Sequence, residues 1–434
     1  MSKTGSPPGI SRRRTVGALA GAGLSLPIIL SPVRGNSQAR TEITLAIWGD
    51  KGSVTAYENV IAKYKTVRPD VAVKFEVTPF GQYYQQIDTR LAGRQAPDLF
   101  RVEFQVVGRY ARSRALMDLT PHLPADFGSA FPAAFWQAVN LDGRTFAIPQ
   151  NTDTLAVFYN VDIFNRLGIR IPAGLAESWS WAEFMDIARL LRARGGVRYS
   201  FAMLWQNSQA YRWLPFLYQH GGQLLSNDLK TPEIESAKGI ETIAWTQNWF
   251  KEGLVPPNTA VKSNEQPQAL FANGTLGMYI GGDWQMPYLD QNSPDVRWNA
   301  TYMPRDVAMA SDLGGSCTAV WRETRNPEAV MDFLKFLTSE TVQRDFTLDG
   351  QFLPVRSALI DGKLAYASRR DARKVFLEQA TTVPPHLVQT VVLPSFSRIN
   401  QRLADQLDLA FTSGQSAELT AKNIGATIST ILRT

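Results

Sequence analysis

Apolar and polar residues follow two periods along this chain, one typical of strands and the other of helices. Residues 43–48 are almost continuously apolar, which favours a buried parallel strand. Apolar residues recur at helical spacing over 57–64, and residues 71–77 alternate strictly, which is the period of a second strand. A helical pattern over 80–91 then precedes a third strand at 99–104. This order of strand, helix, strand, helix and strand predicts a doubly wound α/β arrangement.

The same alternation continues further along the chain. Residues 146–149 and 154–159 are predicted strands, and Ser180 with Glu183 has the spacing of a capping box that opens a helix. Another helix is expected to begin at Asn326-Pro327. Because a chain of 434 residues is too long for one hydrophobic core, we expect two α/β lobes.

The composition is that of a globular protein, with 44% hydrophobic and 19% charged residues. No run of about 18 apolar residues occurs in the body of the chain, which argues against a polytopic membrane protein. The formal net charge is +6, but residues 1–39 hold five basic residues and no acidic one, so residues 40–434 carry only +1. We therefore expect no nucleic-acid partner, because a near-neutral body does not attract phosphate backbones.

Residues 1–39 have the pattern of an export signal peptide. Residues 12–14 are three arginines in a twin-arginine-like pattern, an apolar stretch rich in Gly and Ala follows over 16–30, and Ala39 ends a small-residue cleavage sequence. We expect the signal peptide to be cleaved near Ala39 and the mature protein to be released into the periplasm.

Enzyme signatures are weak in this sequence. The three histidines, His122, His220 and His386, fit no zinc-binding spacing, and the single cysteine, Cys317, precedes an apolar run and is predicted to be a buried, inert thiol. We therefore predict a protein that is not an enzyme and has no metal and no cofactor. An exported glycosidase or oxidoreductase is the alternative, because carboxylates are plentiful and twin-arginine export often serves proteins folded around cofactors.

Tryptophans in predicted loops are the strongest chemical signal. Eleven tryptophans are present, and three of them follow apolar runs beside Gly, Asp or Gln: Trp48 in Trp48-Gly49-Asp50, Trp205, and Trp284 in Gly281–Trp284. Ligands of open α/β sheets bind outside the carboxyl ends of the strands. Indole rings beside carboxylates and amides suit a sugar, whose C–H faces pack on the ring while its hydroxyls bond the polar groups.

The sequence resembles the family 1 extracellular solute-binding proteins of ABC importers, the maltose-binding-protein-like, carbohydrate-type group. The resemblance covers nearly the whole mature chain, and each motif is weak alone but strong in this order. The motifs are Ile43–Trp48, Gly93–Leu99, Leu141–Pro149, Phe158–Asn160, Ala269–Trp284, Gly314-Gly315, Asn326–Ala329 and Gly350–Arg356.

The resemblance implies an α/β, two-lobed periplasmic binding protein fold of type 2. Each lobe would be a mixed sheet flanked by helices, and the hinge would contain several crossovers. By this resemblance lobe 1 comprises residues 40–151 plus 316–357, lobe 2 comprises 152–315 plus 358–434, and the ligand lies in the cleft between them.

The resemblance also implies a set of ligand contacts. Trp284 matches the best-marked sugar-stacking position of the family, and Asp50 is the expected hydroxyl acceptor after the first strand. Gln209 and Tyr211 align with a carboxylate and an aromatic residue of maltose-type members, and glutamine at 209 argues against maltose itself. The predicted ligand-binding residues are Trp48, Asp50, Lys51, Glu103, Asp153, Trp205, Gln209, Tyr211, Gly282, Asp283, Trp284 and Arg356.

Together these features predict a monomeric periplasmic component of an ABC importer that binds a mono- or oligosaccharide and delivers it to the membrane permease. The alternative on the same scaffold is an anionic sugar or a phosphorylated polyol. Arg101, Arg212 and Arg356 lie near predicted cleft loops and could pair with such an anion.

Overall fold

The computed structural model describes residues 40–205, 209–360 and 364–433. The chain divides into residues 1–39 and residues 40–434, and the fold below is that of the second part. The predicted signal peptide and its twin-arginine pattern lie outside the described residues and stay a prediction. Within the described residues, no helix is long and apolar enough to cross a membrane.

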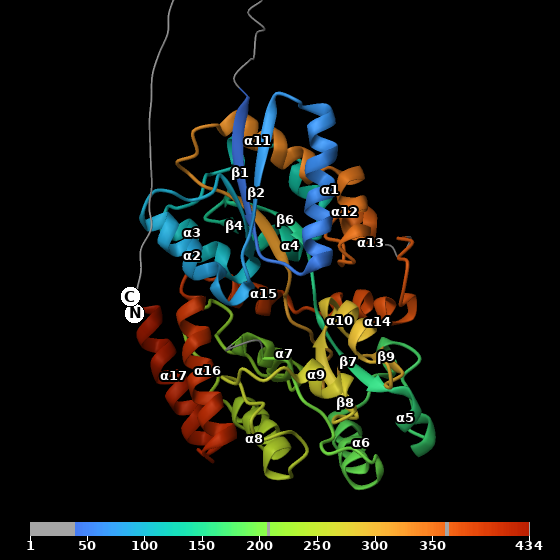
Figure 1. Cartoon of the computed structure of the whole chain (residues 1–434). Coiled ribbons are helices and arrows are strands. Elements are labelled where there is room, and N and C mark those ends of the chain that lie inside the picture. Colours follow the sequence, from blue (N-terminus) through green and yellow to red (C-terminus); the bar gives the residue numbers. More distant parts are fainter. Residues whose placement is uncertain (1–39, 206–208, 361–363, 434) are drawn as a thin grey trace, which may run out of the picture. The chain divides into compact units, whose positions relative to one another are not determined.

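Five strands form the first sheet, in the order β2-β1-β3-β10-β6. Figure 1 shows β1 and β2 side by side in this sheet. Their bounds are Thr41–Ile47 (β1), Val71–Val77 (β2), Leu99–Glu103 (β3), Ala147–Asn151 (β6) and Ser316–Val320 (β10). β1 is parallel to β2 and β3, whereas β10 is antiparallel to β3 and β6. The predicted doubly wound start is confirmed, and the sheet is mixed because the chain returns to it from a distant part of the sequence.

Two helices connect the first three strands and position the loops that follow them. They are Lys51–Val67 (α1) and Phe80–Ala92 (α2). Tyr83 of α2 is fully buried, and its hydroxyl donates to the Ala46 carbonyl at 3.0 Å and the Arg101 carbonyl at 2.9 Å. This side chain therefore ties α2 across the carboxyl-terminal parts of β1 and β3.

Three antiparallel strands form the second sheet, in the order β8-β7-β9. Their bounds are Leu155–Asn160 (β7), Met278–Gly282 (β8) and Trp298–Thr301 (β9). The segment before Trp205 runs parallel to β8 through single bridges from Tyr199 to Leu276 and from Met203 to Ile280. The second sheet is thus also extended by a parallel neighbour, as expected for a mixed sheet.

The remaining elements surround the two sheets. The hairpin strands are Asn140–Leu141 (β4) and Arg144–Thr145 (β5). The remaining α-helices are Phe104–Arg112 (α3), Ala133–Gln137 (α4), Val161–Leu167 (α5), Trp181–Arg194 (α6), Leu214–Gln219 (α7), Ala237–Lys251 (α8), Pro267–Ala272 (α9), Met286–Asn292 (α10), Pro327–Leu337 (α11), Glu340–Asp349 (α12), Ser357–Ile360 (α13), Arg370–Ala380 (α14), Pro385–Val391 (α15), Phe396–Thr412 (α16) and Ala417–Leu432 (α17). Short 3₁₀ helices are Thr120–His122 (η1), Phe127–Ala130 (η2), Leu175–Glu177 (η3), Ala210–Trp213 (η4) and Asp283–Gln285 (η5).

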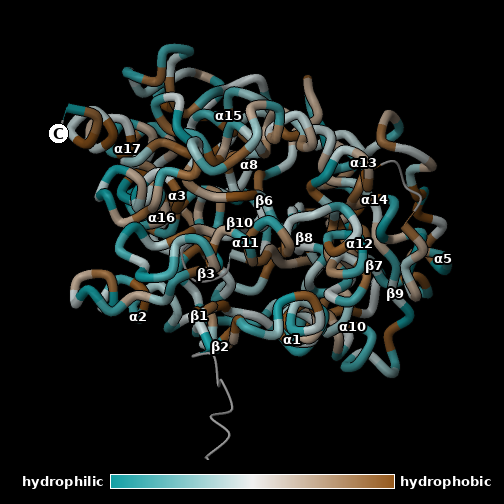
Figure 2. The backbone as a smooth tube through the Cα atoms, turned by 90° about the horizontal axis from the view of Figure 1, so that it is seen from above, coloured by the Kyte–Doolittle hydropathy of each residue, from teal (hydrophilic) through white to brown (hydrophobic). Residues whose placement is uncertain are grey.

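Local signals in the sequence predicted most of these boundaries. The capping box of α6 is confirmed, since the Ser180 hydroxyl accepts from the Glu183 amide at 3.1 Å and the Glu183 carboxylate accepts from the Ser180 amide at 2.7 Å. The third predicted strand ends one residue early, because Phe104 begins α3. Figure 2 shows hydrophobic and hydrophilic residues alternating around α16 and α17, since each helix buries one face.

The chain passes between the two sheets more than once. Residues 152–154 lead from β6 to β7, and residues 312–315 lead into β10. The Thr152 amide donates to the Leu353 carbonyl at 3.2 Å, and the Thr152 hydroxyl donates to the Gly314 carbonyl at 3.3 Å. Three connecting segments therefore lie side by side, which confirms a two-lobed fold with several crossovers.

Gly315 shows how closely these connecting segments pack. Its φ is +98°, and a Cβ atom there would lie 2.3 Å from the Asn151 carbonyl oxygen. Only glycine fits both requirements without displacement of the backbone.

The C-terminal helices contact elements around both sheets. α16 packs against α3, which follows β3 of the first sheet, and also against η4 and α8, which belong to the part of the chain between β7 and β8. The lobe limits predicted from the sequence stay a prediction, and residues 385–412 contribute to the packing of both halves.

Candidate ligand-binding site

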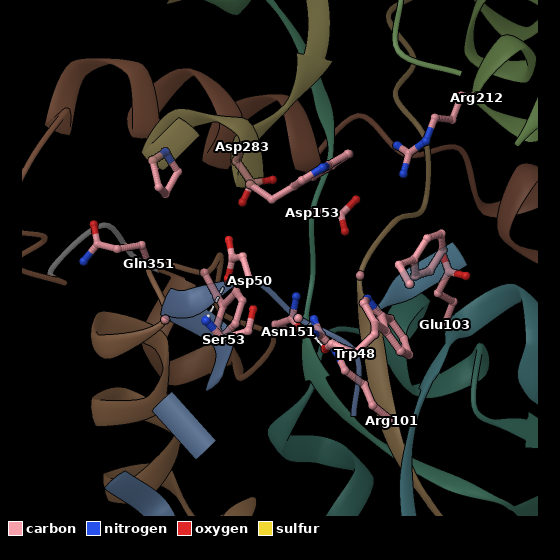
Figure 3. Close-up of a pocket in the computed structure, with 17 residues that line it drawn as sticks. Trp48, Asp50, Ser53, Arg101, Glu103, Asn151, Asp153, Arg212, Asp283 and Gln351 are labelled. Atoms are coloured by element: carbon pink, nitrogen blue, oxygen red, sulfur yellow. Dashed lines mark hydrogen bonds between the residues drawn. The ribbon is translucent and has the colours of Figure 1, made fainter. Parts of the chain in front are cut away.

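A cavity of about 330 Å³ lies between the loops of the two sheets. This volume is within the range of small-molecule sites in proteins. The aromatic side chains that line it are Trp48, Phe80, Trp284 and Phe352. The charged side chains that line it are Asp50, Arg101, Glu103, Asp153, Arg212 and Asp283. Figure 3 shows the carboxyl groups of Asp50, Asp153 and Asp283 directed into the same space.

The loop after β1 supplies Trp48, Gly49 and Asp50. Asp50 is the N-cap of α1, and its carboxylate accepts from the Ser53 amide at 2.8 Å. Glycine is needed at 49 because a Cβ atom there would lie 2.5 Å from that of Ser53. The tight turn brings both the indole and the carboxylate to the cavity.

Arg101 is hydrogen-bonded to this loop. Its guanidinium group donates to the Trp48 carbonyl at 2.8 Å, to the Ser316 hydroxyl at 2.7 Å and to the Asn151 side-chain oxygen at 3.2 Å. The same group lies 4.4 Å from the centre of the Trp48 ring, a cation–π contact. Arg101 is 6% exposed, so it acts mainly as a support that joins β3 and β10 to the end of β6.

Glu103, at the end of β3, is bonded to the opposite side of the cleft. Its carboxylate accepts from the Gln209 amide group at 3.1 Å and from the Gln105 amide group at 3.1 Å. Burial raises the pKa of Glu103, and the nearby charge of Arg212 acts in the lowering direction. The bond to Gln209 links the first-sheet side of the cleft to the segment that begins η4.

Arg212 and Asp312 form a buried ion pair beside the cavity. Their side chains are 2% and 0% exposed, and the guanidinium and carboxylate groups approach to 2.8 Å. Burial raises the pKa of Asp312, while Arg212 acts to lower it. The Arg212 guanidinium also lies 4.6 Å from the centre of the Trp284 ring and donates to the Gln209 side-chain oxygen at 3.1 Å.

Asp153 and Asp283 are two further carboxyl groups of the cavity wall. Burial, assisted by the charges of Asp312 and Glu103, raises the pKa of Asp153 to about 7. Burial and the charge of Asp153 raise the pKa of Asp283. One oxygen of Asp283 accepts from the Thr154 amide at 3.3 Å, whereas Oδ1 of Asp153 is buried without a protein partner among the described residues. Asp153 therefore has unused hydrogen-bonding capacity in the pocket.

Six of the predicted ligand contacts meet at this cavity. They are Trp48, Asp50, Glu103, Asp153, Asp283 and Trp284. Gln209 and Tyr211 line an adjoining cavity of about 320 Å³, which shares Phe80 and Glu103 with the first. Lys51 is the exposed first residue of α1, immediately after the lining residue Asp50.

Gly282 supports the site through its lack of a side chain. A Cβ atom at this position would lie 1.7 Å from the Trp284 ring, so glycine makes room for the indole. Gly282 is not among the residues that line the cavity, and a ligand contact at this position stays a prediction.

Two predicted contacts lie outside the cavity lining. Trp205 is 3% exposed in the hydrophobic core, and its indole nitrogen donates to the Thr259 carbonyl at 3.0 Å. Arg356 donates to the Thr338 carbonyl at 2.6 Å and lies over the Phe131 ring. Both residues lie in or beside sequence patterns typical of a sugar site. In the folded protein their side chains instead contact the protein itself.

Several lining residues have only weak signals in the sequence. Phe80 reads as the apolar start of a helix, and Asn151 as the end of a strand, so neither stands out. Gln351 and Phe352 lie in the motif Gly350–Arg356, from which the sequence analysis selected Arg356 instead. Arg373, 2% exposed, donates to both the carbonyl and the side-chain oxygen of Gln351 at 2.8 Å and so holds this loop in place.

The single cysteine does not line the cavity. Cys317 is fully buried, and burial raises the pKa of its thiol, as predicted for an inert cysteine. Across residues 40–205, 209–360 and 364–433, no group of three or more His, Cys, Asp or Glu side chains is arranged to hold a metal ion. The cavity lining combines aromatic rings with hydrogen-bonding side chains, which are the groups that a small polar ligand can contact.

Two curated proteins are similar in sequence to this chain over most of its length. A relative from Brucella abortus (strain 2308), described as a binding protein, is 21% identical over 380 residues, which cover 87% of this chain and 90% of the relative. The galactooligosaccharide-binding protein of Bacillus subtilis (strain 168) is 20% identical over 306 residues, 68% of this chain and 69% of that protein.

Solved structures show the same fold. The ABC substrate-binding protein Lmo0181 from Listeria monocytogenes, in complex with cycloalternan, matches with a TM-score of 0.79 at 22% identity, over 90% of this chain and 98% of that chain. The model of the bacterial extracellular solute-binding protein family matches residues 49–344, which is more than half of the chain. This chain belongs to the family of bacterial extracellular solute-binding proteins.

Proposed function

We propose that this protein is the solute-binding component of an ABC importer and binds a mono- or oligosaccharide in the cleft between its two sheets. The observation that carries the proposal is the lining of the cavity, in which the indoles of Trp48 and Trp284 stand beside the carboxyl groups of Asp50, Glu103 and Asp153. Aromatic rings pack on the C–H faces of a sugar, and carboxylates accept from its hydroxyls.

The relatives support a carbohydrate as the ligand class. The Bacillus subtilis relative is named for a galactooligosaccharide, and the family as a whole consists of extracellular solute-binding proteins. The protein would therefore bind and release its ligand without converting it.

A neutral or basic sugar fits the cleft better than an anionic one. Arg101 is engaged with a carbonyl, a hydroxyl and an amide oxygen, and Arg212 is paired with Asp312. Arg356 lies outside the cavity lining. An anionic sugar or phosphorylated polyol would approach several carboxylates before it found a guanidinium group to pair with.

Export, partners and oligomeric state complete the proposal. The pattern of residues 1–39 supports removal of a signal peptide near Ala39 and release of the mature protein into the periplasm. There it would act as a monomer, close its lobes around the sugar and present the closed form to the membrane permease, since hinge closure is the switching mode of periplasmic binding proteins.

A thermal-shift screen tests the ligand class. The purified protein is heated with neutral mono- and disaccharides, amino sugars, uronates, polyols and sugar phosphates. A ligand present at about 100 times its Kd adds about 2.7 kcal/mol to the free energy of unfolding, which raises the Tm by several degrees. A shift with a sugar, without formation of a product, is the expected result. A screen in which only non-carbohydrate solutes stabilise the protein would contradict the proposal.

A further inference from the structure

The charged groups that line the cleft are unequal in number. They are the carboxylates of Asp50, Glu103, Asp153 and Asp283 and the guanidinium groups of Arg101 and Arg212. Arg212 is already paired with a fifth carboxylate, that of Asp312, at 2.8 Å. Acidic side chains around the cavity therefore outnumber basic ones, and any ligand that enters meets this imbalance.

Arg101, the other basic residue of the lining, forms no ion pair with these carboxylates in the described structure. Arg101 gives its N–H groups to the Trp48 carbonyl, the Ser316 hydroxyl and the Asn151 side chain, and forms no ion pair in the described structure. These contacts fix its guanidinium group beneath the loop after β1. It thus supports the wall of the cavity, while the charges of Arg212 and Arg373 only partly offset the effect of burial on Asp153 and Asp283.

Asp153 is the clearest unpaired group. Its Oδ1 atom is buried and has no hydrogen-bond donor among the described residues, and Figure 3 shows its carboxyl group facing the cavity together with those of Asp50 and Asp283. Asp283 is only 2% exposed, so it too has little access to water. Carboxylates of this kind need both a hydrogen bond and a compensating charge.

A sugar hydroxyl supplies the first requirement but not the second. It can donate a hydrogen bond, yet it leaves the negative charges uncompensated when the cleft loses water on closure. A protonated amine supplies both, because it carries three N–H donors and a positive charge. The raised pKa values of Asp153 and Asp283 agree with carboxyl groups that lack such a partner while the cleft is without ligand.

We propose that the preferred ligand is a sugar that carries a basic amino group, held by the carboxylates of Asp153, Asp283 and Asp50. This inference rests on the proposed function, because it names the class of sugar for the same cleft. The ammonium group lies among the three carboxylates, and the rest of the sugar packs on the tryptophan rings.

Calorimetric titration of the purified protein at neutral pH with matched sets of sugars tests the inference. Each set contains a 2-amino sugar, its N-acetyl derivative and the parent neutral sugar, in the glucose, galactose and mannose series and as the corresponding disaccharides. We expect the free amine in at least one set to bind about tenfold or more tighter than both neutral counterparts. We also expect that preference to weaken as ionic strength rises from about 0.01 M to about 0.15 M.

Charge-removing variants show whether the named carboxylates are responsible. Asp153→Asn keeps the shape of the side chain and is expected to reduce the amine preference to less than about threefold. Asp50→Asn is the second variant, because asparagine caps a helix as well as aspartate and α1 keeps its N-cap. Asp186→Asn, an exposed carboxylate on α6 that pairs with Arg189, is the control and should leave the preference intact.

The possible outcomes separate the two proposals. Equal or tighter binding of neutral or N-acetylated sugars overturns the amine inference and leaves the sugar-binding function standing. An amine preference that persists in both Asp153→Asn and Asp50→Asn overturns the assignment of these carboxylates. Failure of every sugar in the sets to bind, with other solutes binding, overturns the proposed function and the inference with it.

Discussion

At the scale of single residues, the environment of Asp153 shifts the pKa of its carboxyl group far from the usual value of an aspartate. The residue lies in the first crossover, where burial removes water and the carboxylates of Asp312 and Glu103 add repulsion, and Arg212 only partly offsets these effects. The pKa of Asp153 is therefore about 7, and the folded protein holds a proton that the unfolded chain releases near pH 4.

Asp153→Asn is expected to stabilise the protein at neutral pH. A carboxyl group whose pKa is raised on folding contributes less to the free energy of unfolding as the pH rises from about 4 to about 7. Asparagine removes this loss, which is at most about 4 kcal/mol at 1.36 kcal/mol per pKa unit. Urea unfolding of both proteins at several pH values checks this. If the variant loses stability between pH 5 and pH 7 as steeply as the natural protein, the prediction fails.

Trp284→Ala is expected to weaken sugar binding at least about tenfold while the fold survives. The indole forms part of the cavity wall, and a central tryptophan of a binding site typically contributes about 2 kcal/mol or more. Calorimetric titration measures the loss. Trp321→Ala is the matched control, because Trp321 is also half-buried but lies away from the cleft. Equal affinity of the Trp284 variant and the natural protein would remove Trp284 from the site.

At the scale of elements, the close approach of α3 to the C-terminal segment joins the two halves of the fold. Gly108 of α3 faces the chain between α15 and α16, where a Cβ atom would lie 2.4 Å from the Val392 carbonyl oxygen and 3.2 Å from the Pro394 nitrogen. Both are backbone atoms, so they cannot move as a flexible side chain could. Glycine at this position therefore sets the distance between the helix and the C-terminal segment.

Gly108→Ala is expected to destabilise the protein by about 1–3 kcal/mol through overpacking. Gly81→Ala is the matched control in helix α2, because nothing lies within 4 Å of a Cβ atom there. Alanine should be neutral at 81 or stabilise by up to about 1 kcal/mol, since it is a better helix former than glycine. Denaturant unfolding gives both values. The same change in stability at the two positions would show that backbone packing does not decide the effect.

At the scale of the whole molecule, the ion pair between Arg212 and Asp312 connects η4 to the crossover that leads back to the first sheet. The crossover is further held by the Leu155 amide, which donates to the Asp312 carboxylate at 3.1 Å. Next to it, Gln209 reaches across the cleft to Glu103. These bonds place the cleft walls, the crossover and the cavity lining in one network.

Arg212→Met is expected to cost about 3–5 kcal/mol, because it leaves the buried carboxylate of Asp312 without its counter-charge. The double variant with Asp312→Asn should recover part of this loss, since no buried charge then remains unpaired. Unfolding free energies of the two single variants and the double variant complete the cycle. A loss of less than about 1 kcal/mol for Arg212→Met would mean that the pair contributes little to the fold.

The sequence predicted the start of the first sheet, the capping box of α6 and the loop tryptophans because these depend on near neighbours in the chain. Periodicity places β1 and β2, and a serine three residues before a glutamate places a helix end. It could not separate Trp284, which lines the cavity, from Trp205, which packs in the core, because both follow apolar segments that pair with a strand of the second sheet. That distinction depends on side-chain contacts far away in the sequence.

Local order and family membership were thus determined by the sequence itself, since hydrophobic periods, caps and ordered motifs act over short stretches of chain. Only the tertiary structure decided which charged groups face the cleft. Arg101 donates to the loop after β1, and Arg212 is paired with Asp312. Oδ1 of Asp153 has no hydrogen-bond donor from the protein in the described structure. These outcomes depend on burial and on contacts between distant segments, and they give the cleft more acidic than basic side chains.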